Sequence, residues 1–193
     1  MKTRNIVLSL GVLILFPLAS KAQQKYEKEF RLKSEMIALS AKEFINSIGS
    51  DFKIKWYKEI SLNDVTIEAK FKHDKKRFSV EFDTLGMLLD VEFIIKKKEI
   101  TPIIHEIIEQ KLDSLYEKWK FRKIQINYTG RGGDIITSMS KNEPSNSIKV
   151  SYEIVLKGKA LGNTQLYEIT FSEQGEIQGI LQIVQDKADH LEY

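Results

Sequence analysis

The stretch Phe78-Ser-Val-Glu-Phe-Asp-Thr-Leu-Gly86-Met-Leu-Leu-Asp-Val has a counterpart in Tyr167-Glu-Ile-Thr-Phe-Ser-Glu-Gln-Gly175-Glu-Ile-Gln-Gly-Ile. Aromatic, β-branched and glycine positions coincide at one constant offset. Alternating apolar and polar residues on either side of a glycine are typical of two strands joined by a tight turn. We therefore expect two related hairpins, with both glycines at positive φ in the turns.

Each hairpin belongs to a longer pattern of one helix followed by four strands. An apolar stripe at helical spacing precedes each set of strands, beginning near Ser34 in the first half and at Thr101-Pro102 in the second. A sheet with one apolar face and a helix with one apolar stripe bury both when they pack together. The sequence therefore predicts an α+β fold of two tandem helix-plus-four-stranded antiparallel sheet units. The helices should pack on one sheet face, with Trp56 buried beneath them, and the opposite face should be polar and solvated.

The same patterns divide the chain into segments. The expected segments are a signal peptide (1–22), a polar leader (23–33), unit 1 (34–98), unit 2 (99–187) and a tail (188–193). Unit 2 contains extra residues at 129–147, a stretch rich in Gly, Ser and Asn. A stretch of this composition and length predicts a long inserted loop.

The N-terminus and the charge balance indicate the compartment. A positive start, the apolar run 6–18 and the small residues Ser20 and Ala22 are typical of a secretory signal peptide, and the run is too short to span a membrane. We expect a periplasmic or secreted protein with no integral membrane segment after cleavage. The chain has 30 basic and 27 acidic residues, and three basic residues leave with the signal peptide. The mature chain is then formally neutral, which argues against a nucleic-acid partner.

The residues give little support for catalysis. No cysteine is present, no Gly-x-Ser-x-Gly occurs, and three scattered histidines do not form a metal-ligand pattern. Glu68 and Glu153 occupy equivalent strand positions, but paired carboxylates do acid–base chemistry only in a cleft that separates their pKa values. We expect no catalytic, cofactor-binding or metal-binding residues and no enzyme activity. An enzyme would require the 129–147 loop to complete a cleft with a perturbed titratable cluster.

The repeated strands, together with Ile54-Lys-Trp-Tyr-Lys-Glu, resemble the PepSY-like, β-lactamase-inhibitor-like secreted proteins of Bacteroidetes-type bacteria. The resemblance covers nearly all of the mature chain, and its motifs are strand aromatics and turn glycines. It implies a tandem helix-on-sheet fold and a non-enzymatic binding role. It carries over no ligand-binding residues.

The expected function is that of an exported, inhibitor-like binding module that presents its polar sheet face to a protein or peptide. Mixed tyrosine, charge and amide on such a face suit a protein partner. The alternative is a carrier that holds a small apolar ligand in a cavity between helices and sheet. The expected partner-binding residues lie on the polar face and in the inserted loop: Lys55, Tyr57, Glu59, Glu68, Lys70, Glu81, Gln125, Asn127, Arg131, Glu153 and Glu168.

Overall fold

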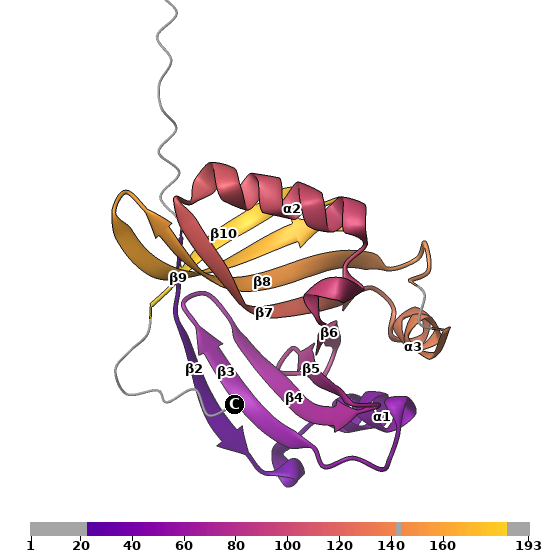
Figure 1. The fold of residues 1–193 in the computed structure, drawn as a ribbon. Helices are drawn as coiled ribbons and strands as arrows, with labels where there is room; N and C mark the ends of the chain where they lie inside the picture. Colours follow the sequence, from indigo (N-terminus) through magenta and orange to yellow (C-terminus); the bar gives the residue numbers. More distant parts are fainter. Residues whose placement is uncertain (1–22, 142–143, 185–193) are drawn as a thin grey trace, which may run out of the picture.

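The computed structural model describes residues 23–141 and 144–184, so the expected signal peptide and tail lie outside the described residues (Figure 1). Three α-helices are present in this part of the chain: α1 (Leu39–Ile48), α2 (Pro102–Leu115) and α3 (Gly132–Lys141). The 3-10 turns η1 (Ser34–Met36) and η2 (Lys97–Glu99) precede α1 and α2. The strands are β1 (Gln23–Lys25), β2 (Glu27–Leu32), β3 (Lys55–Ser61), β4 (Val65–His73), β5 (Lys76–Phe82), β6 (Leu88–Ile94), β7 (Lys118–Thr129), β8 (Lys149–Ala160), β9 (Asn163–Ser172) and β10 (Ile177–Ile183).

All ten strands form one mixed sheet in the order β1-β10-β9-β8-β7-β6-β5-β4-β3-β2. The expected fold of two separate four-stranded units is therefore wrong. The reason is the pairing of β6 with β7, in which Val91 lies opposite Tyr128 and Phe93 opposite Ile126. This antiparallel pair joins the strands that follow α1 to the strands that follow α2, so neither set has a free edge at this point.

The segment expected to be a loose polar leader forms both edge strands of this sheet. β1 pairs in parallel with β10, and β2 pairs antiparallel with β3. Only Tyr26 separates β1 from β2, so one short segment binds both ends of the sheet and nearly closes it on itself. Irregular register in β5–β6, β7–β8 and β9–β10 accompanies this curvature, as expected because bulges bend a strand and increase its twist.

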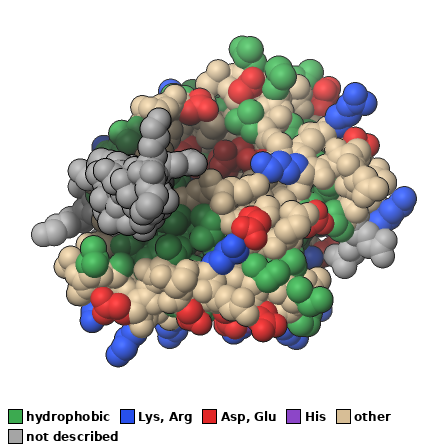
Figure 2. Space-filling model, turned by 90° about the horizontal axis from the view of Figure 1, so that it is seen from above, with side chains coloured by type: hydrophobic (Ala, Val, Ile, Leu, Met, Phe, Trp, Pro, Cys, Tyr) green, Lys and Arg blue, Asp and Glu red, His purple; other side chains and the backbone are tan. Residues whose placement is uncertain are grey.

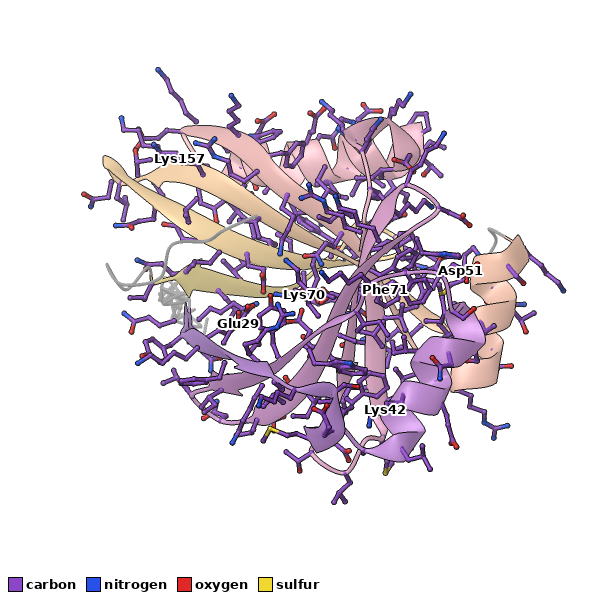
Figure 3. All side chains as sticks on the ribbon, turned by 90° about the horizontal axis from the view of Figure 1, so that it is seen from below. Glu29, Lys42, Asp51, Lys70, Phe71 and Lys157 are labelled. Carbon is purple, nitrogen blue, oxygen red and sulfur yellow. The ribbon has the colours of Figure 1, made fainter. Side chains whose placement is uncertain are left out.

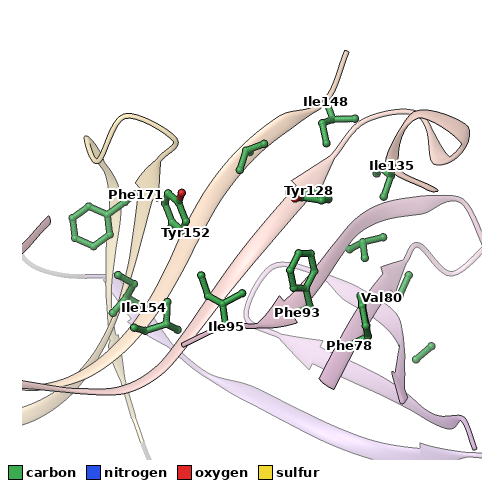
Figure 4. Close-up of a cluster of buried hydrophobic side chains, with 14 of the residues drawn as sticks. Phe78, Val80, Phe93, Ile95, Tyr128, Ile135, Ile148, Tyr152, Ile154 and Phe171 are labelled. Carbon is green, nitrogen blue, oxygen red and sulfur yellow. The ribbon is translucent and has the colours of Figure 1, made fainter. Parts of the chain in front are cut away.

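The apolar core lies between the sheet and the helices, on the outer side of the curve (Figures 1 and 4). Phe93 of β6 and Tyr128 of β7 pack edge to face, with ring centroids 5.4 Å apart, and so carry the core across the middle of the sheet. Ile45 of α1, Ile108 of α2 and Ile135 of α3 are wholly buried against it. Trp56 is 4% exposed in the same cluster, which confirms its expected burial.

The two hairpin turns bring the sheet against the helices. Gly86 has φ +86° and Gly175 has φ +80°, as expected from the sequence. A Cβ atom on Gly86 would lie 2.5 Å from Ser40 Oγ, beside α1, and one on Gly175 would lie 3.0 Å from Ile107 Cγ2 of α2. Glycine is needed at both turns because the backbone is left-handed and the helix is close.

Residues 129–147, expected to form a long loop, contain α3 and the last residue of β7. Ile135 and Ser138 of α3 are buried. At its first residue, Gly132, a Cβ atom would lie 2.9 Å from the ring of Phe44 in α1. The prediction of a loop here was wrong, because a short amphipathic helix rich in Gly, Ser and Thr has the composition of a loop.

Candidate functional site

The candidate site is the inner, concave face of the curved sheet. Strand register places its polar side chains in adjacent rows: Tyr57 opposite Glu68, Glu68 opposite Glu81, and Glu81 opposite Asp90. Gln125 lies opposite Glu153 farther along the sheet. We call this surface the concave face, with the polar side chains Lys25, Tyr57, Glu59, Glu68, Lys70, Ser79, Glu81, Asp90, Glu92, Gln125, Asn127, Ser151, Glu153 and Glu168.

Alternation predicted correctly which residues share this face, but the expectation that it is solvated was wrong. Glu68 and Asn127 are each only 5% exposed, and Gln125 and Glu168 are also buried. The face is enclosed because the sheet curves and β1 and β2 close it. Figure 2 shows a hollow in the surface, with acidic and hydrophobic side chains inside it.

At the β2–β4 side of the concave face, one lysine contacts two carboxylates. Lys70 Nζ lies 2.6 Å from Glu29 Oε1 and 3.0 Å from Glu68 Oε2, and Glu29 and Lys70 point toward each other inside the curve (Figure 3). Ser79 Oγ donates a hydrogen bond to the other oxygen of Glu68. Burial alone would lower the pKa of Lys70, but Glu68 and Glu29 outweigh it and raise that pKa.

Glu29, Glu59 and Glu68 each offer a carboxylate oxygen within 4.8 Å of the others, a spacing that could hold a metal ion. Lys70 Nζ contacts two of these three carboxylates, so the ammonium group already supplies a positive charge at this position. The group is therefore better explained as a lysine–carboxylate network than as a metal site.

At the closure between β1 and β10, a second lysine has the same role. Lys25 Nζ lies 2.7 Å from Glu168 Oε1 and 2.7 Å from Glu27 Oε1. Burial alone would lower the pKa of Lys25, and the two carboxylates together raise it. This ion pair joins the N-terminal segment to β9 across the short parallel pairing of β1 with β10.

Between these two networks lie four carboxylates, Glu81, Asp90, Glu92 and Glu153, which we call the central carboxylates. Among the described residues, no lysine or arginine nitrogen lies within 4.0 Å of any of them. Burial and then the charge of Asp90 raise the pKa of Glu81 to about 9, and burial and then Glu92 raise that of Asp90 to about 7. Burial and then Glu92 raise the pKa of Glu153 to about 9. When ionised, the central carboxylates therefore repel one another, and water screens this repulsion poorly because the groups are partly buried.

Two amides of β7 hold part of this group in position. Gln125 Nε2 donates to Glu92 Oε2 at 2.6 Å, and Asn127 Nδ2 lies 3.2 Å from Glu92 Oε1 and 3.4 Å from Glu153 Oε1. Asp90 Oδ1 is buried without a hydrogen-bond partner in the described structure. Such an orphaned acceptor is uncommon in folded proteins and requires an explanation.

The structure brings together most of the sequence-predicted binding residues and separates one. Lys55 is exposed, on the same face as Tyr57, and its Cα partner in β4 is Lys70. Arg131 does not belong to the concave face: it is exposed in the turn before α3. Sequence reasoning missed Asp90 and Glu92, although their alternation with Val91 and Phe93 places them on the same face as the other polar strand residues. It also missed Lys25 and Glu29, because nothing in a polar N-terminal stretch shows that it pairs with both sheet edges.

No family model matches the chain, and no curated protein is similar to it in sequence. Its fold is similar to that of two crystal structures. The first is a DUF2874 family protein from Bacteroides ovatus, with TM-score 0.51 and 12% identity, covering 76% of this chain and 87% of that one. The second is a BLIP-like protein from Bacteroides fragilis, with TM-score 0.50 and 15% identity, covering 80% of this chain and 92% of that one. At these identities the likeness concerns the fold.

Proposed function

We propose that this chain is an exported, non-enzymatic binding module that takes a protein or peptide partner on its concave face. The observation that carries this proposal is the set of central carboxylates. They lie on β5, β6 and β8, one buried and three half-buried, and within the described residues no lysine or arginine nitrogen lies within 4.0 Å of them. Carboxylates ionised in such a place destabilise the fold. Features that reduce stability are typical of functional sites.

The similar folds support this class of function. A BLIP-like protein among the structural neighbours agrees with an inhibitor-like role, which is the finer form of the proposal. Export agrees with the expected signal peptide, and no helix in the described part of the chain is long and apolar enough to cross a membrane.

The apolar-ligand carrier has no comparable support. It needs a cavity between helices and sheet, where Phe82, Ile108 and Leu112 are wholly buried. Two surface depressions of the described residues lie elsewhere. One is beside Lys75–Arg77 and the other beside Arg31–Glu35, and no residue of α1, α2 or α3 lines either.

Perturbed carboxylates in a hollow also favour one second candidate, acid–base hydrolysis. That chemistry needs one protonated and one ionised carboxyl, with pKa values pushed apart. Here burial and repulsion raise the pKa values of Glu59, Glu81, Asp90 and Glu153 in the same direction. A set shifted in one direction suits charge recognition better. Turnover of chromogenic glycosides that is lost in Glu81→Gln would favour the enzyme instead.

A photo-crosslinking experiment tests the binding proposal. Tyr57, half-buried on the concave face, is replaced by p-benzoylphenylalanine, and Ile103, 72% exposed on α2, is replaced in the same way as the matched control. Both variants are irradiated in the native periplasm. We expect a discrete adduct from position 57 and none of that size from position 103. Equal adducts from both positions, or none from position 57, would contradict the proposal.

A further inference from the structure

The two lysine networks show how the concave face accommodates a cation. The Lys70 ammonium group contacts Glu68 of β4 and Glu29 of β2, and the Lys25 ammonium group contacts Glu168 of β9 and Glu27 of β2. Each cation keeps its charge there because the carboxylates outweigh the penalty of burial. The central carboxylates lie on β5, β6 and β8 of the same face, but no lysine or arginine of the described residues contacts them.

The hydrogen bonds around the central carboxylates leave carboxyl oxygens without a partner. Gln125 and Asn127 already direct their NH2 groups at Glu92, and Asn127 also reaches Glu153. The buried Asp90 Oδ1 accepts from nothing described, and Glu81 has no hydrogen-bonded side-chain partner in the described residues. A ligand that brings several donors and a positive charge would pair these oxygens and favour the ionised form of the carboxyl groups.

The spacing of the oxygens indicates the kind of cation. The described residues contain one acidic group tight enough for a metal ion, Glu29, Glu59 and Glu68, and Lys70 contacts it. The central carboxylates do not converge in this way but are distributed over β5, β6 and β8. A guanidinium presents five donors in a planar fork, so it can bind several separated carboxylates at once.

We propose that the partner inserts a cationic side chain, arginine in preference to lysine, from a peptide segment among Glu81, Asp90, Glu92 and Glu153. This inference rests on the proposed function and names the chemistry of its partner. Glu81, Asp90 and Glu153 are half-buried, so part of each side chain remains accessible to an entering ligand. The peptide backbone would follow the face while the guanidinium supplies the missing donors.

The test uses the protein purified from the periplasm and the peptide acetyl-Gly-Arg-Gly-amide. The control peptide carries citrulline, which has nearly the same shape as arginine but no charge. Binding is followed by the NMR signals of the Gln125 and Asn127 side-chain amides, at pH 8 and low salt. We expect the arginine peptide to bind at least tenfold more tightly than the citrulline peptide. Equal binding of the two peptides, or no binding of either, overturns the inference.

Two variants locate the site. Glu81→Gln with Asp90→Asn replaces two ionisable carboxyl groups by amides of the same shape, and should abolish the preference for arginine over citrulline. Glu43→Gln, at an exposed position on α1, is the matched control and should keep the preference. Melting followed by circular dichroism verifies folding. A folded double variant that retains the preference overturns the assignment.

Other occupants give distinct results. Spermidine that binds more tightly than the arginine peptide would identify a free polyamine instead of a peptide. A chain ending at Val184 that binds the arginine peptide, when the full chain does not, would identify the chain's own C-terminal residues as the occupant. Either result overturns the inference. If the crosslinking experiment gives an adduct at position 57 but the arginine peptide does not bind, the proposed function stands and only this inference fails. If the arginine peptide binds but no crosslinked adduct forms, only the proposed function loses support.

Discussion

Glu81→Gln should stabilise the protein at alkaline pH and have little effect at acidic pH. Burial and the neighbouring Asp90 raise the pKa of Glu81 from 4.5 to about 9. The folded protein thus holds this proton more tightly than the unfolded chain does. The resulting stability is fully present below pH 4.5, and it is lost as the pH rises to about 9. Glutamine cannot ionise, so the variant avoids this loss.

The magnitude follows from the size of the shift. One pKa unit corresponds to about 1.4 kcal/mol, so the full shift sets an upper bound of roughly 6 kcal/mol between pH 4.5 and 9. Asp90 shares the same repulsion, and interacting groups do not contribute additively. We therefore expect Glu81→Gln to raise the free energy of unfolding by about 2–3 kcal/mol at pH 9.

The assay is urea unfolding at pH 5, 7 and 9, followed by the fluorescence of Trp56 and Trp119. Wild type should become less stable across this series, and Glu81→Gln should lose less stability. Glu43→Gln, exposed on α1, should follow wild type. Parallel curves for wild type and Glu81→Gln would refute the idea that repulsion on the concave face destabilises the ionised protein. They would also remove the electrostatic argument for a cationic partner.

Four further substitutions and one deletion test the fold. Lys25→Met should cost about 1–3 kcal/mol at pH 8 in urea unfolding, because it leaves buried carboxylate charge without its partner; a neutral outcome would show that the closing ion pair contributes nothing. Placing an alanine in the left-handed backbone conformation costs roughly 1–2 kcal/mol. Gly86→Ala should destabilise the protein by more than this, since its Cβ would also clash with the start of α1. Gly162→Ala has a similar φ of +78° in open space and should show the backbone penalty alone, so equal losses in the two would refute the close approach. Trp56→Ala should cost about 3–5 kcal/mol, and an unchanged melting temperature would contradict its place in the core. Excision of Gly132–Asn146 should lower the melting temperature markedly because α3 carries buried side chains, and unaltered melting would show that α3 is dispensable.

The sequence predicts the local structure and the faces of the strands well. Helix α2 begins at Pro102, the turns contain Gly86 and Gly175 at positive φ, and Trp56 is on the covered side. These features depend on periodicity and on single-residue conformational preferences, which are local. The same rules fail for α3, because Ser, Thr and Gly are as common in loops as in a short helix of this kind.

The sequence could not predict the single, nearly closed sheet or the burial of the polar face. Period-two alternation shows which residues share a face, but it contains no information about how far the sheet bends. The alternation therefore predicts Glu68 and Glu153 to be solvated with the rest of the polar face, whereas burial is the largest cause of their raised pKa values. The pairing of β1 with β10 joins opposite ends of the described chain, and no local pattern specifies a contact of this range.

The N-terminal segment both nearly closes the sheet and adds Lys25 to the charges of the concave face. β1 pairs with β10 over only three residues, and Lys25 reinforces this short pairing through its contact with Glu168. Pairing of the first strand with the last requires nearly the whole sheet to be in place, since contacts far apart in sequence form late. Burial of the central carboxylates is then completed as the sheet closes, and their repulsion opposes this step. A cationic side chain bound among them would remove that repulsion, so ligand binding should stabilise the closed sheet as well as occupy the concave face.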